Sequence, residues 1–168
     1  EILTYVLSGT VAHRDSMGNI SQVTAGEFQI MSAGTGITHS EYNPSATEEL
    51  HLYQIWIRPD QARVAPRYEQ RQFPRQEGFQ LLLSPDGEEG SLHVYQDMRL
   101  WRWSSSVEGG RSASYPVGKR AIWLQVSRGR VEVDGIVLEA GDAMALKDEP
   151  ELVLSATSEA EVLLFDLP

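Results

Sequence analysis

The stretch Tyr5-Val-Leu-Ser-Gly-Thr-Val-Ala-His13 has a counterpart in Leu124-Gln-Val-Ser-Arg-Gly-Arg-Val-Glu-Val133, near the other end of the chain. In both stretches an apolar run is broken by a glycine and resumes with a valine two residues later. Each is followed by a triplet of alanine, glycine and an acid, Ala25-Gly-Glu27 in one copy and Ala140-Gly-Asp142 in the other. Glycine and acidic residues at such places are typical of tight turns. The repetition predicts two related β units in tandem.

The rest of the chain consists of short apolar or alternating runs separated by turn residues, a pattern typical of an all-β protein. Turn signals include Glu108-Gly-Gly110 and Asp134-Gly135, whereas Arg67–Phe73 is compatible with one helical turn. We expect two tandem β-barrels, residues 1–73 and 79–168. The expected strands are 2–7, 10–15, 28–32, 50–57, 79–83, 92–95, 99–104, 121–127, 130–134, 136–138, 143–147, 151–156 and 161–166.

Composition excludes several classes of function. The chain has 14 Lys and Arg against 24 Asp and Glu, a net charge of -10, which disfavours binding to nucleic acid or to anionic membranes. The absence of cysteine excludes disulfides, thiolate catalysis and cysteine-ligated metal centres. No secretion signal and no membrane-length apolar run is visible, so a cytoplasmic location is expected.

The segment Met31-Ser-Ala-Gly-Thr-Gly-Ile-Thr-His-Ser-Glu-Tyr-Asn43 is the best candidate for a site. His39 and Glu41 lie two residues apart, which places both side chains on one face of a strand. An imidazole and a carboxylate that converge in this way suit a divalent first-row metal. By itself the pattern is weak evidence, and taken alone it favours a strand-end pair that only forms hydrogen bonds within the fold.

The other histidines and the tryptophans are expected to have structural roles. We expect His13 to lie on a solvated rim, His93 to point to solvent, and His51 to be a barrel histidine that shares a face with Tyr53 and Ile55. No histidine follows His93, so a metal site is expected only in the first unit. The tryptophans are expected in the barrel cores or in packing between the barrels: Trp56, Trp101, Trp103 and Trp123.

These residues carry a resemblance to known families. Gly34 followed by His39 and Asn43 resembles the second cupin motif, and the repeat makes the chain resemble a bicupin. More specifically, the chain resembles the pirin family, and within it the bacterial pirin-like proteins with quercetin 2,3-dioxygenase activity. The segments that carry this likeness are Glu1–Gly9, His13–Asn19, Ala25–Asn43, Leu52–Ile57, Pro66–Arg71 and Leu163–Pro168.

The resemblance implies one divalent metal, usually iron, held in the first barrel by three histidines and one glutamate. His39 and Glu41 match the third histidine and the glutamate. The other two histidines belong in the family to a His-x-His motif before the segment that matches Glu1, and Glu1 itself is implied to be at most a neighbour of the ligands. The first barrel is therefore expected to lack its N-terminal strands within residues 1–168. We expect residues upstream of Glu1 in the real molecule, a deletion variant being the alternative.

The resemblance also implies an activity. A flavonol such as quercetin would bind the metal, Glu41 would accept its hydroxyl proton as the catalytic base, and O2 would then cleave the ring. Two alternatives remain open at this point. One is a non-catalytic metal-binding regulator that acts through protein partners, and the other is a truncated bicupin without activity.

Overall fold

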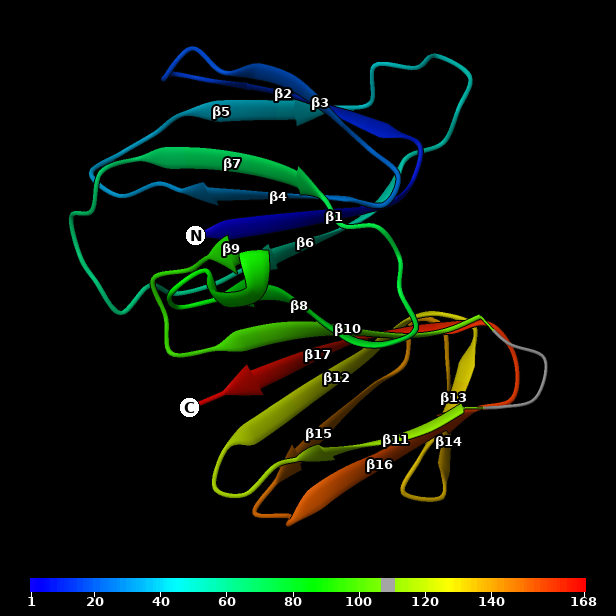
Figure 1. Ribbon diagram of the computed structural model, residues 1–168. Helices are drawn as coiled ribbons and strands as arrows, with labels where there is room; N and C mark the ends of the chain where they lie inside the picture. Colours follow the sequence, from blue (N-terminus) through cyan, green and yellow to red (C-terminus); the bar gives the residue numbers. More distant parts are fainter. Residues whose placement is uncertain (107–110) are drawn as a thin grey trace. The chain divides into compact units, whose positions relative to one another are not determined.

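The computed structural model describes residues 1–106 and 111–168, whose regular secondary structure is almost entirely β-strand (Figure 1). The turn predicted at Glu108-Gly-Gly110 lies outside the described residues. The chain forms two compact units: the first contains Glu1–Pro74 with Val94–Gln96, and the second contains Arg75–His93 with Asp97–Pro168. Val94–Gln96 thus joins the first unit, although the sequence prediction assigned it to the second. Among the described residues, no helix is long and apolar enough to cross a membrane.

The first unit consists of two antiparallel sheets, which Figure 1 shows in blue to green. One sheet has the strand order β6-β1-β4-β7 and the other has the order β3-β2-β5. Val6, Val11 and Val23 form a small apolar core between them. The strands are β1 (Ile2–Ser8), β2 (Thr10–Asp15), β3 (Ile20–Thr24), β4 (Glu27–Ser32), β5 (His39–Tyr42), β6 (His51–Trp56) and β7 (Arg67–Gln72).

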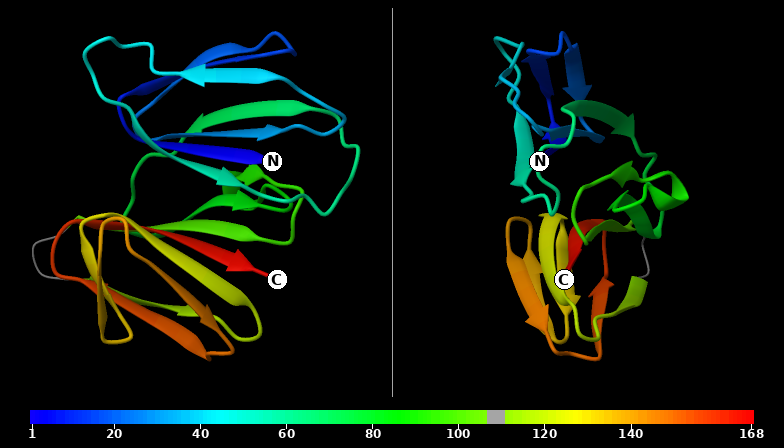
Figure 2. Two further views of the ribbon diagram at one scale, coloured as in Figure 1. Left: turned by 180° about the vertical axis from the view of Figure 1, so that it is seen from behind. Right: turned by 90° about the vertical axis from the view of Figure 1, so that its left-hand side faces the viewer.

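The second unit also consists of two sheets, with the orders β15-β12-β17-β10-β8-β9 and β11-β16-β13-β14 (Figure 2). A large apolar core around Trp103, Leu124, Leu154 and Leu164 fills the space between them. The elements are β8 (Gly78–Ser84), the short 3-10 helix η1 (Glu88–Gly90), β9 (Leu92–His93), β10 (Arg99–Ser105), β11 (Arg111–Pro116), β12 (Ala121–Arg128), β13 (Arg130–Val133), β14 (Ile136–Glu139), β15 (Ala143–Lys147), β16 (Glu151–Ala156) and β17 (Ala160–Leu167).

The predicted internal repeat is confirmed by strand pairing. β1 lies between β4 and β6 as β12 lies between β15 and β17, and β2 pairs with β3 and β5 as β13 pairs with β14 and β16. The repeated glycines occupy the same backbone conformation, with φ of 77° at Gly9 and 73° at Gly129. A Cβ atom at either glycine would collide with a carbonyl oxygen, that of Glu49 or Glu159. The repeat therefore extends from the sequence to the detailed backbone geometry.

The two units differ at their sheet edges. In the second unit β17 has β10 as its second neighbour, and β16 has β11. Within residues 1–106 and 111–168, the equivalent strands β6 and β5 each have only one neighbour. The first unit therefore presents open edges on both of its sheets, at β5 and at β6.

The prediction of an all-β fold is confirmed, and so are the positions of most strands. The strand expected at 92–95 is shorter, since β9 spans only Leu92–His93. The helical turn proposed for Arg67–Phe73 is wrong, because Arg67–Gln72 pairs with β4 as strand β7. The expected strands also lacked β3, β5 and β11, and all three have many polar residues.

Candidate metal centre

The candidate site lies in the first unit, where β2 pairs with β5 in an antiparallel ladder. His39 and Glu41 stand two residues apart on β5, and the register pairs them with Asp15 and His13 of β2. The rings of His13 and His39 are stacked with their centroids 5.7 Å apart. Paired strands thus bring together two histidines and two carboxylates that are far apart in the sequence.

The Glu41 carboxylate is held by three side chains. The Gln29 Nε2 donates to Oε1 at 2.7 Å, and the Gln54 Nε2 donates to Oε2 at 2.6 Å. The His13 Nδ1 lies 3.4 Å from Oε1. The Glu41 side chain is only 11% exposed. A carboxylate oxygen can accept more than one hydrogen bond, so each oxygen keeps capacity for another partner.

His13 is buried, so the prediction of a solvated rim residue is wrong. The residue is 1% exposed, and its Nε2 lies 3.2 Å from the Asp15 Oδ2. Its ring packs against Tyr68 with centroids 4.7 Å apart. Strand alternation explains the burial, because position 13 faces Glu41 on the inner side of the unit.

Asp15 is a well-satisfied carboxylate at the end of β2. Burial raises its pKa, but hydrogen bonds from the Asn19 and His13 side chains and from the backbone amides of Asn19 and Met17 outweigh burial and lower the pKa to about 2. The Asn19 side chain donates to Oδ2 at 2.7 Å. Asp15 therefore keeps its negative charge beside His13.

Tyr68 closes the cluster from β7. Its hydroxyl lies 2.5 Å from the Ser21 Oγ and 3.0 Å from the Gln29 Oε1. Burial raises the pKa of Tyr68, and the negative charge of Glu41 raises it further. Tyr68 is therefore a neutral phenol, able to donate to the buried Gln29 side chain.

A polar row, defined here as Gln54, Thr4 and Gln29, runs across β6, β1 and β4 directly opposite Glu41. The register pairs Thr4 with Gln29 on one side and with Gln54 on the other, so all three side chains project from the same face of the sheet. Thr4 is fully buried, and within the described residues its Oγ1 has no hydrogen-bond partner. A buried hydroxyl without a partner is costly in an apolar core. The described contacts of the site therefore leave one buried hydroxyl, that of Thr4, unsatisfied.

The same positions are apolar in the second unit. The pairing of His13 with Glu41 is repeated by the pairing of Val133 with Leu154. The strand pairings give the other equivalences. On the strands that carry this pair, Val133 takes the place of His13, Leu152 that of His39 and Leu154 that of Glu41. On the facing sheet, Leu124 takes the place of Thr4, Met144 that of Gln29 and Leu164 that of Gln54. All of these except Met144 are completely buried. One copy of the fold thus fills this space with hydrocarbon, and the other lines it with hydrogen-bonding groups.

The residues present fit a metal only in part. His39 and Glu41 offer a nitrogen and an oxygen donor of the kind that a divalent first-row ion prefers. Protein-bound ions of this kind usually have at least three protein ligands. Within the described part of the chain, no group of three or more histidine, aspartate or glutamate side chains could hold a metal. The pair therefore fits two positions of a coordination sphere, and the described residues do not complete it.

The other histidines lie away from this cluster. His51 is exposed and packs at an angle against Tyr53 with ring centroids 6.2 Å apart, so its predicted place inside the barrel is wrong. His93 is half-buried, not directed to solvent as expected. Glu1 accepts hydrogen bonds from the Ser32 Oγ at 2.7 Å and the Tyr95 amide at 2.9 Å. These contacts tie down the start of β1 and involve neither His39 nor Glu41.

The tryptophans divide into two groups. Trp103 is completely buried in the core of the second unit, and Trp101 packs against that core, as predicted. Trp56 is 76% exposed and Trp123 is 45% exposed, so the prediction of core positions is wrong for these two. Trp56 is exposed on β6, at the open edge of its sheet.

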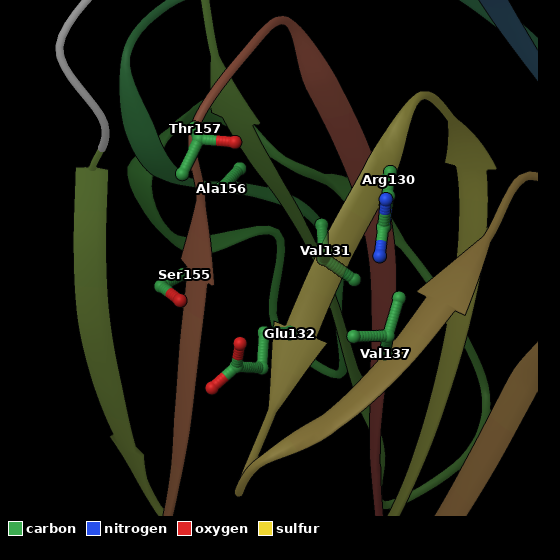
Figure 3. Close-up of a pocket in the computed structure, with 7 residues that line it drawn as sticks. All are labelled: Arg130, Val131, Glu132, Val137, Ser155, Ala156 and Thr157. Carbon is green, nitrogen blue, oxygen red and sulfur yellow. The ribbon is translucent and has the colours of Figure 1, made fainter.

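Two surface pockets accompany these features. One, with a volume of about 320 Å³, opens beside His39 and is lined by Arg14, Asp15, Ser16, Thr38, His39 and Ser40. The other, of about 260 Å³, lies in the second unit where β13 and β16 diverge (Figure 3). Figure 3 shows the Glu132 side chain in the space between these strands. Only the first pocket adjoins the cluster around Glu41.

Comparison with known proteins gives consistent results for both units. Residues 1–57 match the family model described as Pirin, and residues 81–167 match the model described as the quercetinase C-terminal cupin domain. A protein of Escherichia coli strain K12 named quercetin 2,3-dioxygenase is 56% identical over 168 residues, which cover 100% of this chain and 72% of that protein. A pirin-like protein of Caulobacter vibrioides is 36% identical, with coverage of 99% and 72%.

Solved structures agree. The bacterial pirin YhhW from Escherichia coli in complex with nickel(II) has a TM-score of 0.93 and 55% identity, over 99% of this chain and 72% of that chain. YhaK from Escherichia coli has a TM-score of 0.85 and 30% identity, over 99% and 74%.

Proposed function

The chain belongs to the pirin family of bicupin proteins, and from this we propose that it is a metal-dependent dioxygenase that cleaves flavonols such as quercetin. We propose His39 and Glu41 as two of the metal ligands and iron as the metal, with Glu41 also serving as the catalytic base. The observation that carries the proposal is the polar interior of the first unit, where the second unit has leucines. The names of the relatives support the flavonol, and the nickel(II) complex of YhhW supports a divalent first-row ion.

The surroundings of Glu41 suit a general base, a group that accepts a proton from the substrate. Its carboxylate lies in a half-enclosed site, and each oxygen receives a hydrogen bond from a glutamine amide, which leaves further lone pairs available. A bound divalent metal would supply Lewis acidity, which lowers the pKa of a coordinated hydroxyl. Glu41 would then accept the proton of the flavonol 3-hydroxyl as general base. The flavonolate reacts with one O2 and yields the depside and carbon monoxide.

His39 would contribute a neutral ring nitrogen and hold its orientation through stacking on His13. The pocket beside His39 gives a small aromatic molecule a route to this face of β5. At the corresponding place in the second unit, Leu152 replaces His39 and is buried. We therefore assign the reaction to the first unit and a structural role to the second.

The test is oxygen-dependent loss of the quercetin absorbance band by protein loaded with iron(II) or nickel(II). We expect turnover by the wild type and none by Glu41→Gln, with a smaller effect of this substitution on quercetin binding. Glu69→Gln is the matched control, because Glu69 lies on β7 and pairs with Arg71 at 2.5 Å, away from Glu41. Equal loss of binding and turnover in Glu41→Gln would overturn the base role. Metal binding without quercetin loss would overturn the dioxygenase and favour the regulator that acts through protein partners.

A further inference from the structure

Two glutamines hold the proposed metal ligand Glu41, one on each carboxylate oxygen. We propose that Gln29 and Gln54 are positioning residues, which fix the Glu41 carboxylate in the orientation that binds the metal, and that Tyr68 fixes Gln29 in turn. The inference rests on the proposed function for the identity of Glu41 as a ligand. It goes further in assigning a role to neutral residues that would not touch the metal themselves.

The direction of each hydrogen bond supports this role. A carboxylate only accepts, so each glutamine must present its amide nitrogen to Glu41, as it does at 2.7 Å and 2.6 Å. The Gln29 oxygen is then directed to the Tyr68 hydroxyl at 3.0 Å. The amide of Gln29 therefore has one satisfactory orientation, with its carbonyl on the phenol and its nitrogen on the carboxylate. Gln29 is 1% exposed, which excludes exchange of these bonds for bulk water.

The position of the pair relative to the carboxylate supports it as well. Gln29 and Gln54 stand on either side of Thr4 in neighbouring strands, β4 and β6, so they reach Glu41 from two directions. With a single donor, the carboxylate group could still rotate about that one hydrogen bond. Two donors on different oxygens fix the plane of the carboxylate. Ligands of protein-bound metals are commonly oriented by such outer hydrogen bonds.

The second unit shows that the fold itself does not require these glutamines. Met144 and Leu164 occupy the places of Gln29 and Gln54, and Leu154 occupies the place of Glu41. The two amides and the carboxylate are thus replaced together by hydrocarbon. Gln29 is buried and the Glu41 side chain is 11% exposed, whereas Gln54 is exposed. Enclosed polar groups such as Gln29 and Glu41 destabilise a core unless they are satisfied, so they are typical of a functional site.

The test is the affinity for nickel(II), measured by calorimetry on the wild type and on variants that carry the equivalent residues of the second unit. We expect Gln29→Met and Gln54→Leu to weaken binding by roughly 10-fold to 100-fold, as substitutions of outer hydrogen-bond partners commonly do. Gln72→Met is the matched control: Gln72 is an exposed glutamine at the end of β7, where it pairs with Glu27 of β4. We expect Gln72→Met to leave the affinity unchanged.

A double-mutant cycle separates positioning from a structural effect. If Gln29 acts through Glu41, then Gln29→Met changes nickel affinity in the wild type and has little further effect in a Glu41→Gln background. Equal effects in both backgrounds would overturn the inference. In the metal-free protein, Glu41→Ala should shift the side-chain amide NMR signals of Gln29 and Gln54 and not those of Gln72. Unshifted signals would overturn it as well.

These outcomes are distinct from failure of the proposed function. A protein that binds nickel with the expected variant pattern but leaves quercetin intact would overturn the dioxygenase and support the positioning role. A wild type that binds no nickel would overturn the metal role of Glu41, and the positioning role with it.

Discussion

At the scale of the residue, Gly9 and Gly129 show how the repeat is fixed by backbone geometry. Both have positive φ, and both approach a carbonyl oxygen so closely that a Cβ atom would have no room. Gly135, in the hairpin between β13 and β14, has a similar φ of 80° but open space where a Cβ would be placed. An alanine at Gly135 would suffer only the backbone strain of positive φ, whereas an alanine at Gly129 would also collide with a carbonyl oxygen. Comparing substitutions at the two positions therefore separates the two effects.

We predict that Gly129→Ala destabilises the protein more than Gly135→Ala. The strain of alanine at positive φ costs about 1 kcal/mol or more at either position. At Gly129 the methyl group must also displace the backbone at Glu159, at a further cost of about 1–3 kcal/mol. The measurement is the free energy of unfolding in urea for both variants. Equal losses would show that strand β17 moves aside freely.

Asp15 leads to a prediction on pH. Its pKa is about 2 in the folded protein against 3.8 for a free aspartate, so the unfolded state takes up its proton first as the pH falls. The stability that Asp15 contributes is therefore complete above pH 3.8 and is lost as the pH falls toward 2. We expect Asp15→Asn to be less stable than the wild type at neutral pH, with the difference shrinking in acid. Unfolding curves over this pH range provide the check, and a constant difference would contradict it.

At the scale of the element, the sequence predicted well where strands have an apolar inner face and poorly where they do not. β12 and β17 carry long apolar runs and were located within one residue at each end. β7 was not recognised because its inward residues, Tyr68 and Gln70, are polar or amphipathic, and its outward residues are charged. The alternation is present, but it does not separate apolar from polar side chains. Periodicity arguments depend on that separation.

The same cause explains which parts of the candidate site could be predicted. The spacing of His39 and Glu41 was visible in the sequence, and the structure places them together on β5. The burial of His13 was missed, because a histidine before a polar turn ordinarily lies at the surface. Gln29 and Gln54 were missed because a lone glutamine in a strand carries no signal. Only the strand register, pairing each with Thr4, shows that they face one carboxylate.

At the scale of the whole molecule, one architecture is used twice with opposite interiors. The second unit packs Leu124, Leu154 and Leu164 into a continuous apolar core. The first unit has Thr4, Glu41 and Gln54 at these places and a small apolar core beside them. Since burial of hydrocarbon is the main source of stability, the first unit gives up stability at the positions where the function is proposed.

Reciprocal substitutions test this division of roles. The triple variant Glu41→Leu, Gln29→Met and Gln54→Leu places in the first unit the residues that the second has at these positions. We expect it to leave the melting temperature unchanged or raise it, because replacing a complete buried polar group by apolar side chains is often neutral or stabilising, whereas Glu41→Leu alone would leave the buried Gln29 amide without its acceptor. Leu154→Glu should cost roughly 3–5 kcal/mol, because its carboxylate would be buried with no donors of the kind that Gln29 and Gln54 provide to Glu41. Scanning calorimetry of both variants measures the asymmetry. A destabilisation of similar size in both would mean that the Glu41 cluster holds the first unit together as firmly as leucines hold the second, and that its polarity is a structural requirement of that unit.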